Sequence, residues 1–202
     1  IMPGDLTDFV AYMTHMKFPG NPNQNLDRSL VSTPANSNAL EGKNVFENTS
    51  VGAAFGITLT CATCHSLPNG SNNLIISELI IQESQSMKVP QMRNLYRREG
   101  MVASGDGKAG VGFIHDGSEE SIESFLALPV FSAWPQNKMD DVAKFARAFD
   151  TGTAPIVGYQ VSFDQSNASD AGVIADMNLL EARAAAGDND LVAKGTWFGV
   201  HR

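Results

Sequence analysis

The only two cysteines of the chain stand three residues apart and are followed at once by a histidine, in the pentapeptide Cys61-Ala62-Thr63-Cys64-His65. Two thiols at this spacing can add to the two vinyl groups of a porphyrin, and the adjacent imidazole can supply a nitrogen ligand to its iron. Chance would put two cysteines and a following histidine in this order in roughly 2 of 10,000 sequences of this composition. We therefore expect one covalent c-type haem, attached to Cys61 and Cys64, with His65 as the proximal ligand.

The same cysteine pair could instead belong to a zinc site or to a thiol redox pair. A structural zinc ion needs about four ligands, and the other histidines are scattered along the chain, at His15, His115 and His201. A thioredoxin-like redox pair needs a strand before it and a long helix after it, and neither pattern surrounds Cys61. Both remain minor alternatives to haem.

A low-spin haem also needs a distal ligand, most often methionine or histidine. Met101 is the leading candidate, because it follows Gly100 and opens a glycine-rich loop that could fold over the distal face. The alternatives are Met139, Met87, Met92 and His115. The metal ligands expected from the sequence are thus His65 and Met101.

Hydrophobic periodicity predicts a chain made mainly of helices. Apolar residues recur at helical spacing over residues 6–18, 40–47, 91–98, 140–150 and 169–186, and Asp116-Gly117-Ser118-Glu119 has the spacing of a capping box that opens another helix. Residues 156–163 and 191–200 alternate like strands, and residues 74–81 fit either a strand or a buried helix. Seven aromatic side chains are expected in the core and the wall of a haem pocket: Phe46, Phe113, Phe125, Phe131, Trp134, Phe145 and Phe149.

Three ordered motifs carry a family resemblance. Gly42-x-x-x-Phe46 followed by the Cys61–His65 motif resembles a class I cytochrome c, and the segments 89–95 (Val-Pro-Gln-Met-Arg-Asn-Leu) and 113–118 (Phe-Ile-His-Asp-Gly-Ser) are similar to the haem domain of the bacterial dihaem cytochrome c peroxidase superfamily. The resemblance implies a mainly α fold, a class I cytochrome c-like helical haem domain with long loops, to which small α/β extensions are added at both ends. This chain departs from the peroxidases in having one haem motif instead of two.

Two further residues are expected to contact the haem or its ligand. The resemblance favours Arg93 as the partner of a haem propionate, and a guanidinium offers the bidentate donor that a carboxylate needs. Pro68 follows shortly after His65, and we expect its backbone carbonyl to accept a hydrogen bond from the second nitrogen of the proximal imidazole.

The predicted organisation has three parts. Residues 1–38 form a helix and a linker, residues 39–152 form the haem domain, and residues 153–202 form a strand-helix-strand extension. The extensions, the non-methionine start and the absence of a leader-like stretch favour a piece of a longer exported protein.

Composition limits the partners. The formal net charge is −8 and basic residues do not cluster, which argues against nucleic-acid binding, and no apolar stretch is long enough to span a bilayer. The haem motif and the family resemblance imply single-electron transfer, with a redox partner protein or a neighbouring domain of the same polypeptide as partner. Covalent haem attachment in bacteria takes place outside the cytoplasm, so we expect the protein in the periplasm, on the outer surface or among secreted proteins. A peroxidase-like haem enzyme with an open or labile distal site is the alternative, and an electron carrier is favoured over an enzyme.

Overall fold

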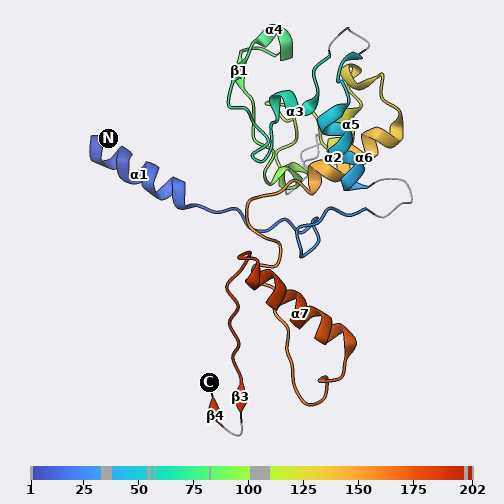
Figure 1. The fold of residues 1–202 in the computed structure, drawn as a ribbon. Coiled ribbons are helices and arrows are strands. Elements are labelled where there is room, and N and C mark those ends of the chain that lie inside the picture. Colours follow the sequence, from blue (N-terminus) through green and yellow to red (C-terminus); the bar gives the residue numbers. More distant parts are fainter. Residues whose placement is uncertain are drawn as a thin grey trace.

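The computed structural model describes residues 2–32, 38–53, 56, 58–81, 83–100, 110–197 and 200–201, and this part of the chain is mainly α-helical, as predicted (Figure 1). Its α-helices are α1 (Pro3–His15), α2 (Ala39–Asn48), α3 (Cys61–Cys64), α4 (Glu78–Ile81), α5 (Ile122–Leu126), α6 (Gln136–Arg147) and α7 (Ala171–Ala185), and its 3-10 helices are η2 (Leu95–Arg98) and η3 (Pro129–Phe131). Two short antiparallel pairs complete it: β1 (Ile75–Ile76) with β2 (Met87–Lys88), and β3 (Thr196–Trp197) with β4 (Val200–His201).

The crossing of α2 and α6 is the centre of the larger folded unit. Gly42 on α2 lies against the backbone of Asp141 on α6, so closely that a Cβ at this position would be 1.9 Å from the Asp141 carbonyl oxygen. This approach lets the Phe46 and Phe145 rings meet edge to face, with centroids 5.2 Å apart. The apolar faces of both helices are buried here, as their 3.6-residue periodicity predicts.

Aromatic residues extend this core, which confirms the core position expected for them. Phe131 packs between Phe125 and Trp134, with both pairs of ring centroids 5.4 Å apart. The Trp134 indole nitrogen donates a hydrogen bond of 2.8 Å to the carbonyl of Ser50, so its polar atom is satisfied inside the core. A short helix, α5, packs beside α6 and closes this side.

The linker before α2 contacts the segment that follows α6. Asn21 is fully buried, and its side-chain amide donates to the carbonyls of Arg147 and Phe149 at 2.7 and 2.8 Å, which satisfies the end of α6. Arg28 forms ion pairs of 3.1 Å with Asp150 and with Asp188 at the end of α7. The linker before α2 and the segment after α6 therefore run side by side, and α7 is attached to both.

Three predicted elements differ in the structure. Residues 156–163 form a turn and an irregular segment instead of a strand. The helix expected at the Asp116 capping box begins at Ile122 with Ser121 as its N-cap, because a bridge between Phe113 and Glu119 holds residues 113–119 as a turn that the Asp116 carboxylate stabilises. Of residues 91–98 only the last four are helical, since Asn94 adopts a left-handed conformation with φ 61°.

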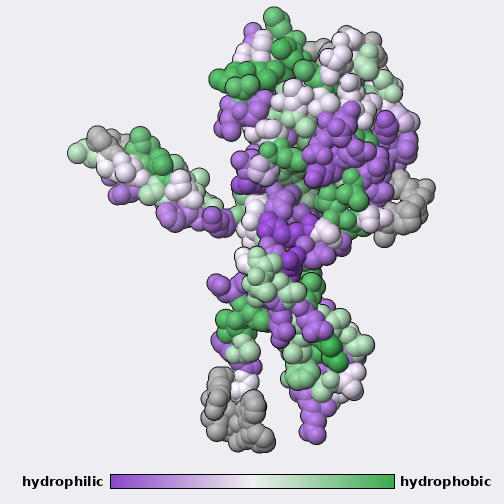
Figure 2. All heavy atoms as spheres, in the orientation of Figure 1, coloured by the Kyte–Doolittle hydropathy of each residue, from purple (hydrophilic) through white to green (hydrophobic). Residues whose placement is uncertain are grey.

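Two apolar surfaces stand out from the folded units. α1 projects away from the rest of the molecule, and its apolar side chains are exposed (Figure 1). The second surface belongs to residues 74–88, which we call the arm; it comprises β1, α4 and β2, and Figure 2 shows apolar side chains gathered over it at the top of the view. Leu79 and Ile80 on α4 are 84% and 69% exposed.

Candidate haem site

The cysteine pair occupies a single helical turn, α3, whose geometry follows from local sequence. Thr60 caps this turn, and its backbone N–H donates to the hydroxyl of Thr63 at 3.1 Å. Residues three apart on a helix point to the same side, so Cys61 and Cys64 lie on one face. The His65 N–H closes the turn on the Cys61 carbonyl at 2.8 Å, and the chain then leaves the helix.

The two thiols are free, and they differ in their surroundings. Cys61 packs with Ala62 against the core cluster that contains Phe46 and Phe145. This burial raises the pKa of the Cys61 thiol to about 12, because a thiolate is poorly solvated there. A porphyrin joined at Cys61 would therefore lie against the apolar core, which is the dry environment that a haem requires.

Within the described part of the chain, the His65 ring is held through one of its two nitrogens. Its Nδ1 lies 3.0 Å from the carbonyl oxygen of Gly70 and 3.1 Å from that of Pro90. Since carbonyl oxygens only accept hydrogen bonds, Nδ1 must carry the proton, and the lone pair is then on Nε2. A backbone carbonyl on one imidazole nitrogen is the usual arrangement behind a histidine that ligates a metal through the other. The residues present thus fit a haem with His65 as proximal ligand.

The predicted role of the Pro68 carbonyl is wrong. The chain turns over residues 67–70, where the Gly70 N–H donates to the Ser66 carbonyl at 2.7 Å, and this turn brings the carbonyl of Gly70, not that of Pro68, to the imidazole. Gly70 is required here, because its φ is +71° and a Cβ would be 2.7 Å from that of Met92. The second acceptor, Pro90, lies in the 89–95 motif, whose link to His65 the sequence did not reveal.

The expected distal ligand, Met101, lies outside the described residues. The described ends of its loop meet beside η2, where the N–H groups of Val111 and Gly112 donate to the Arg98 carbonyl at 3.1 and 3.0 Å. Met92 is buried in the core, Met139 packs against the same core from α6, and Met87 is partly buried on β2. The identity of the distal ligand stays a prediction.

His115, the histidine alternative, has a partner that sequence spacing did not indicate. Its Nδ1 lies 2.6 Å from the carboxylate of Glu83, which follows α4 within the arm. Arg98 stabilises the turn that contains His115, because its side chain donates hydrogen bonds to the carbonyls of Gly112 and Ile114 at 2.7 and 3.3 Å. Ile114 has φ 60°, an unusual value for a β-branched residue, and such backbone conformations concentrate at functional sites.

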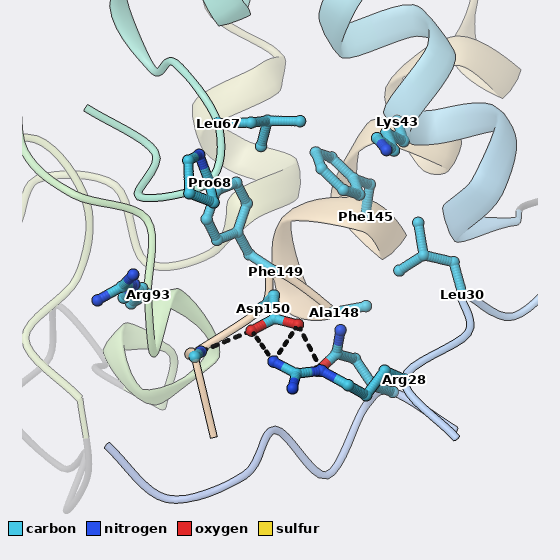
Figure 3. A pocket seen from close by; sticks show the side chains of 12 residues that line it. Arg28, Leu30, Lys43, Leu67, Pro68, Arg93, Phe145, Ala148, Phe149 and Asp150 are labelled. Carbon is cyan, nitrogen blue, oxygen red and sulfur yellow. Dashed lines mark hydrogen bonds and ion pairs between the residues drawn. The ribbon is translucent and has the colours of Figure 1, made fainter. Parts of the chain in front are cut away.

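Arg93 contacts the loop that follows His65. One of its terminal nitrogens donates to the side-chain oxygen of Asn69, whereas its Nε is buried with no hydrogen-bond partner in the described structure. The contact with a haem propionate stays a prediction. Arg93 and Pro68 both line a cavity beside Phe149 (Figure 3).

In the described ranges, no three or more histidine, cysteine or acidic side chains gather as they would around a metal ion. No helix in the same ranges is both long enough and apolar enough to cross a membrane. Comparison with known proteins adds nothing to the site: no family model, no curated protein and no solved structure matches the chain.

Proposed function

We propose that this chain carries one c-type haem and passes single electrons, as a class I cytochrome c-like domain of a larger exported redox protein. The observation that carries the proposal is the state of His65: two carbonyls fix its Nδ1, and Nε2 is left for iron. This arrangement stands directly after two free thiols on one helical face.

The roles of the chain's own residues follow from that arrangement. Cys61 and Cys64 would hold the porphyrin by two thioether bonds, and His65 would be the proximal ligand. A haem in this site supplies one-electron chemistry through its ferric and ferrous states. The carbonyls of Gly70 and Pro90 keep the imidazole oriented and increase the electron density on Nε2, which favours the ferric state. Met101 remains the proposed distal ligand.

The cellular setting is part of the same proposal. Covalent haem attachment in bacteria takes place outside the cytoplasm, so we place the protein in the periplasm, on the outer surface or among secreted proteins. Its electron partner would be another redox protein or a neighbouring domain of the same polypeptide.

Mass spectrometry under denaturing conditions tests covalent attachment. We expect the full chain, produced in bacteria that carry the c-type maturation machinery, to retain the mass of one haem, and Cys61→Ser with Cys64→Ser to lose it completely. His65→Gln should lower haem incorporation and abolish the low-spin spectrum, whereas His15→Gln, on the exposed surface of α1, should change neither. A wild-type chain that carries no haem after denaturation would refute the proposal.

Optical spectroscopy then tests the distal ligand and the reaction. A ferric spectrum with the thioether-to-iron charge-transfer band that is lost in Met101→Ala supports methionine ligation and electron transfer. Loss of the same band in Met139→Ala, with Met101→Ala unaffected, would move the distal ligand to α6. A five-coordinate, high-spin spectrum would instead favour the alternative function.

The pair of Glu83 and His115 favours a peroxidase-like haem enzyme as the second candidate. A carboxylate 2.6 Å from Nδ1 orients an imidazole so that Nε2 can take up and release a proton, as an acid–base catalyst must. A high-spin haem protein that oxidises a reductant with hydrogen peroxide, and loses this activity in His115→Gln, would establish the enzyme. Rapid electron exchange without peroxide turnover would establish the carrier.

A further inference from the structure

The arm presents a largely exposed apolar surface. Leu79 and Ile80 on α4 stand out most, and at the base of the arm Leu74 and Ile75 are 59% and 73% exposed. Figure 2 shows apolar side chains gathered over this part of the molecule. Single exposed apolar side chains are common on protein surfaces, but a group of them marks a place where something binds. The arm is therefore a candidate docking surface.

Hydrogen bonds hold the arm in one shape. Its two strands pair antiparallel at the base. Around α4, the hydroxyl of Ser86 donates to the carboxylate of Glu78, so the two sides of the arm are joined a second time. Beyond α4, Glu83 connects the arm to His115 of the 113–119 turn. A surface that is ordered before contact loses little conformational entropy when a partner binds.

The segments at both ends of the arm are hydrogen-bonded to the haem motif. Before the arm, the Asn72 N–H donates to the carbonyl of Cys64 at 2.8 Å, and the Asn72 side chain donates to the carbonyl of Thr63 at 3.1 Å. After the arm, the Pro90 carbonyl lies 3.1 Å from Nδ1 of His65. A protein that docks on the arm therefore binds a segment whose ends contact the proposed haem attachment and the proposed proximal ligand.

The apolar side chains of the arm are accompanied by acidic ones. Residues 74–88 and 113–120, which His115 joins, contain five carboxylates and one lysine, a net charge of −4 with histidine neutral, where the whole chain has −8. Asp116 is exposed, and Glu78 and Glu119 are partly exposed. Complementary charge across an interface increases the rate of encounter and excludes wrong partners. The arm thus fits an apolar patch that is ringed by lysine or arginine.

The same charge disfavours other occupants. A second copy of this chain would bring identical acidic residues to the contact, and α1, the other exposed apolar element, carries Asp5 and Asp8. A lipid surface with anionic headgroups would also be repelled. The apolar part of the arm consists of a few side chains, and such a small area is typical of the short-lived contacts of electron-transfer proteins.

We propose that the arm is the docking surface for the redox partner, and that this partner is a basic electron-transfer protein with an apolar contact patch. Leu79 and Ile80 pack against that patch. Glu78, Asp116 and Glu119 attract the basic residues around it. The inference rests on the proposed electron transfer, and it adds the place of contact and the charge of the partner.

Laser-flash kinetics with zinc-substituted mitochondrial cytochrome c test the apolar contact, because this basic probe has lysines around its contact patch. Its excited porphyrin gives one electron to the ferric iron of the haem-loaded full chain, so the porphyrin is oxidised and the iron becomes ferrous. We expect the second-order rate constant to fall about tenfold in Leu79→Ser with Ile80→Ser. Phe9→Ser with Val10→Ser, at exposed positions of α1, is the matched control and should leave it unchanged.

The charge of the arm is tested with substitutions that keep a hydrogen-bond acceptor at each position. The variant combines Glu78→Gln, Asp116→Asn and Glu119→Gln. Its matched control removes three charges at exposed positions elsewhere: Asp8→Asn, Glu181→Gln and Asp190→Asn. We expect the first set to lower the rate constant about fivefold at low ionic strength and to flatten its dependence on salt, and the control set to have a smaller effect. A probe with acetylated lysines should react slowly with wild type.

The arm variants should keep the optical spectrum and the reduction potential of wild type, so that a slower reaction reflects docking and not a changed haem. Equal rate constants in wild type and both arm variants would overturn the proposal. A wild-type dimer in sedimentation analysis that Leu79→Ser with Ile80→Ser converts to a monomer would also overturn it, because a second copy then covers the arm. Failure of the proposed function gives a different result: the chain then holds no haem that ascorbate or dithionite can reduce, whatever the state of the arm.

Discussion

Gly42→Ala is the sharpest test of the helix crossing that supports the haem motif. The added Cβ would be 1.9 Å from the Asp141 carbonyl oxygen and 2.9 Å from Phe145 Cβ. The nearest obstacle is backbone, so no side-chain rotation relieves it. To reach an ordinary contact of 3.4 Å, α2 and α6 must separate by about 1.5 Å, whereas a gap of 0.5–1 Å already removes a quarter to a half of a dispersion contact.

The expected loss follows from these contacts. Overpacking costs about 1–3 kcal/mol and more where backbone must move, and separation also weakens the Phe46–Phe145 pair, worth about 1 kcal/mol. Replacing glycine by alanine inside a helix returns about 1 kcal/mol. We expect a net loss of about 3 kcal/mol, a large share of the 5–15 kcal/mol typical of a domain.

Urea denaturation followed by far-ultraviolet circular dichroism measures this loss, with wild type and variant in the same haem state. Gly4→Ala is the matched control: Gly4 also lies in a helix, but a Cβ there meets nothing within 4 Å, so its change should stay within about 1 kcal/mol. A lower midpoint at an unchanged slope is a change in stability alone. If Gly42→Ala loses less than about 1 kcal/mol, the close crossing is refuted.

Three further outcomes are expected. Asn21→Leu removes two buried hydrogen bonds at the end of α6 and should cost about 2 kcal/mol in urea unfolding, whereas Asn25→Leu, at an exposed position, should cost little. Burial raises the pKa of the Cys61 thiol to about 12. In the haem-free Cys64→Ser variant, this thiol should therefore react with iodoacetamide at pH 8 about a thousandfold more slowly in the folded protein than in urea. Equal rates in the folded and unfolded protein would contradict its burial. Arg147 lowers the pKa of the Glu123 carboxyl by a hydrogen bond, so the ionised Glu123 stabilises the fold at neutral pH and this stabilisation is lost as the pH falls through the folded-state pKa. The difference in unfolding free energy between wild type and Glu123→Gln should therefore shrink from pH 7 to pH 3. A difference that stays constant over this range would contradict the argument.

The parts of the structure that sequence predicted are those fixed by local chemistry. α2 follows from the apolar positions of residues 40–47, and the structure places it at Ala39–Asn48. α6 follows from apolar residues repeated on one helical face, and it was predicted within a few residues of its bounds. The capping signal at Asp116 failed because two local structures compete for the same residues. The Asp116 carboxylate accepts from the Ser118 N–H inside the turn that the Phe113–Glu119 bridge closes, and so it does not cap a helix.

The candidate site shows the same division. Cys61, Cys64 and His65 are neighbours in sequence, so the haem hypothesis could be stated from their types and spacing, whereas the groups that hold the His65 ring could not be predicted. The acceptors that hold His65 come from Gly70, five residues on, and from Pro90, twenty-five residues on. Backbone carbonyls occur at every residue, so no residue type marks the ones that meet an imidazole.

The position of Pro90 also connects the arm to the proposed proximal ligand. The two ends of the arm are fastened at its base, where the Val89 N–H donates to the Leu74 carbonyl at 2.9 Å and the buried Ser71 hydroxyl donates to the Val89 carbonyl at 2.7 Å. Pro90 follows directly and reaches His65 Nδ1. Ser71→Ala therefore weakens the base of the arm, although Ser71 does not contact the imidazole. The hydrogen bond from Nδ1 raises the basicity of Nε2, so a weaker hydrogen bond to the Pro90 carbonyl should raise the reduction potential of the haem-loaded protein. Ser66→Ala is the control, because Ser66 lies in the same loop and its side chain makes no hydrogen bond to the described residues of the arm; it should leave the potential unchanged. Equal potentials in wild type and Ser71→Ala would show that Gly70 alone sets the electron density on the ligand.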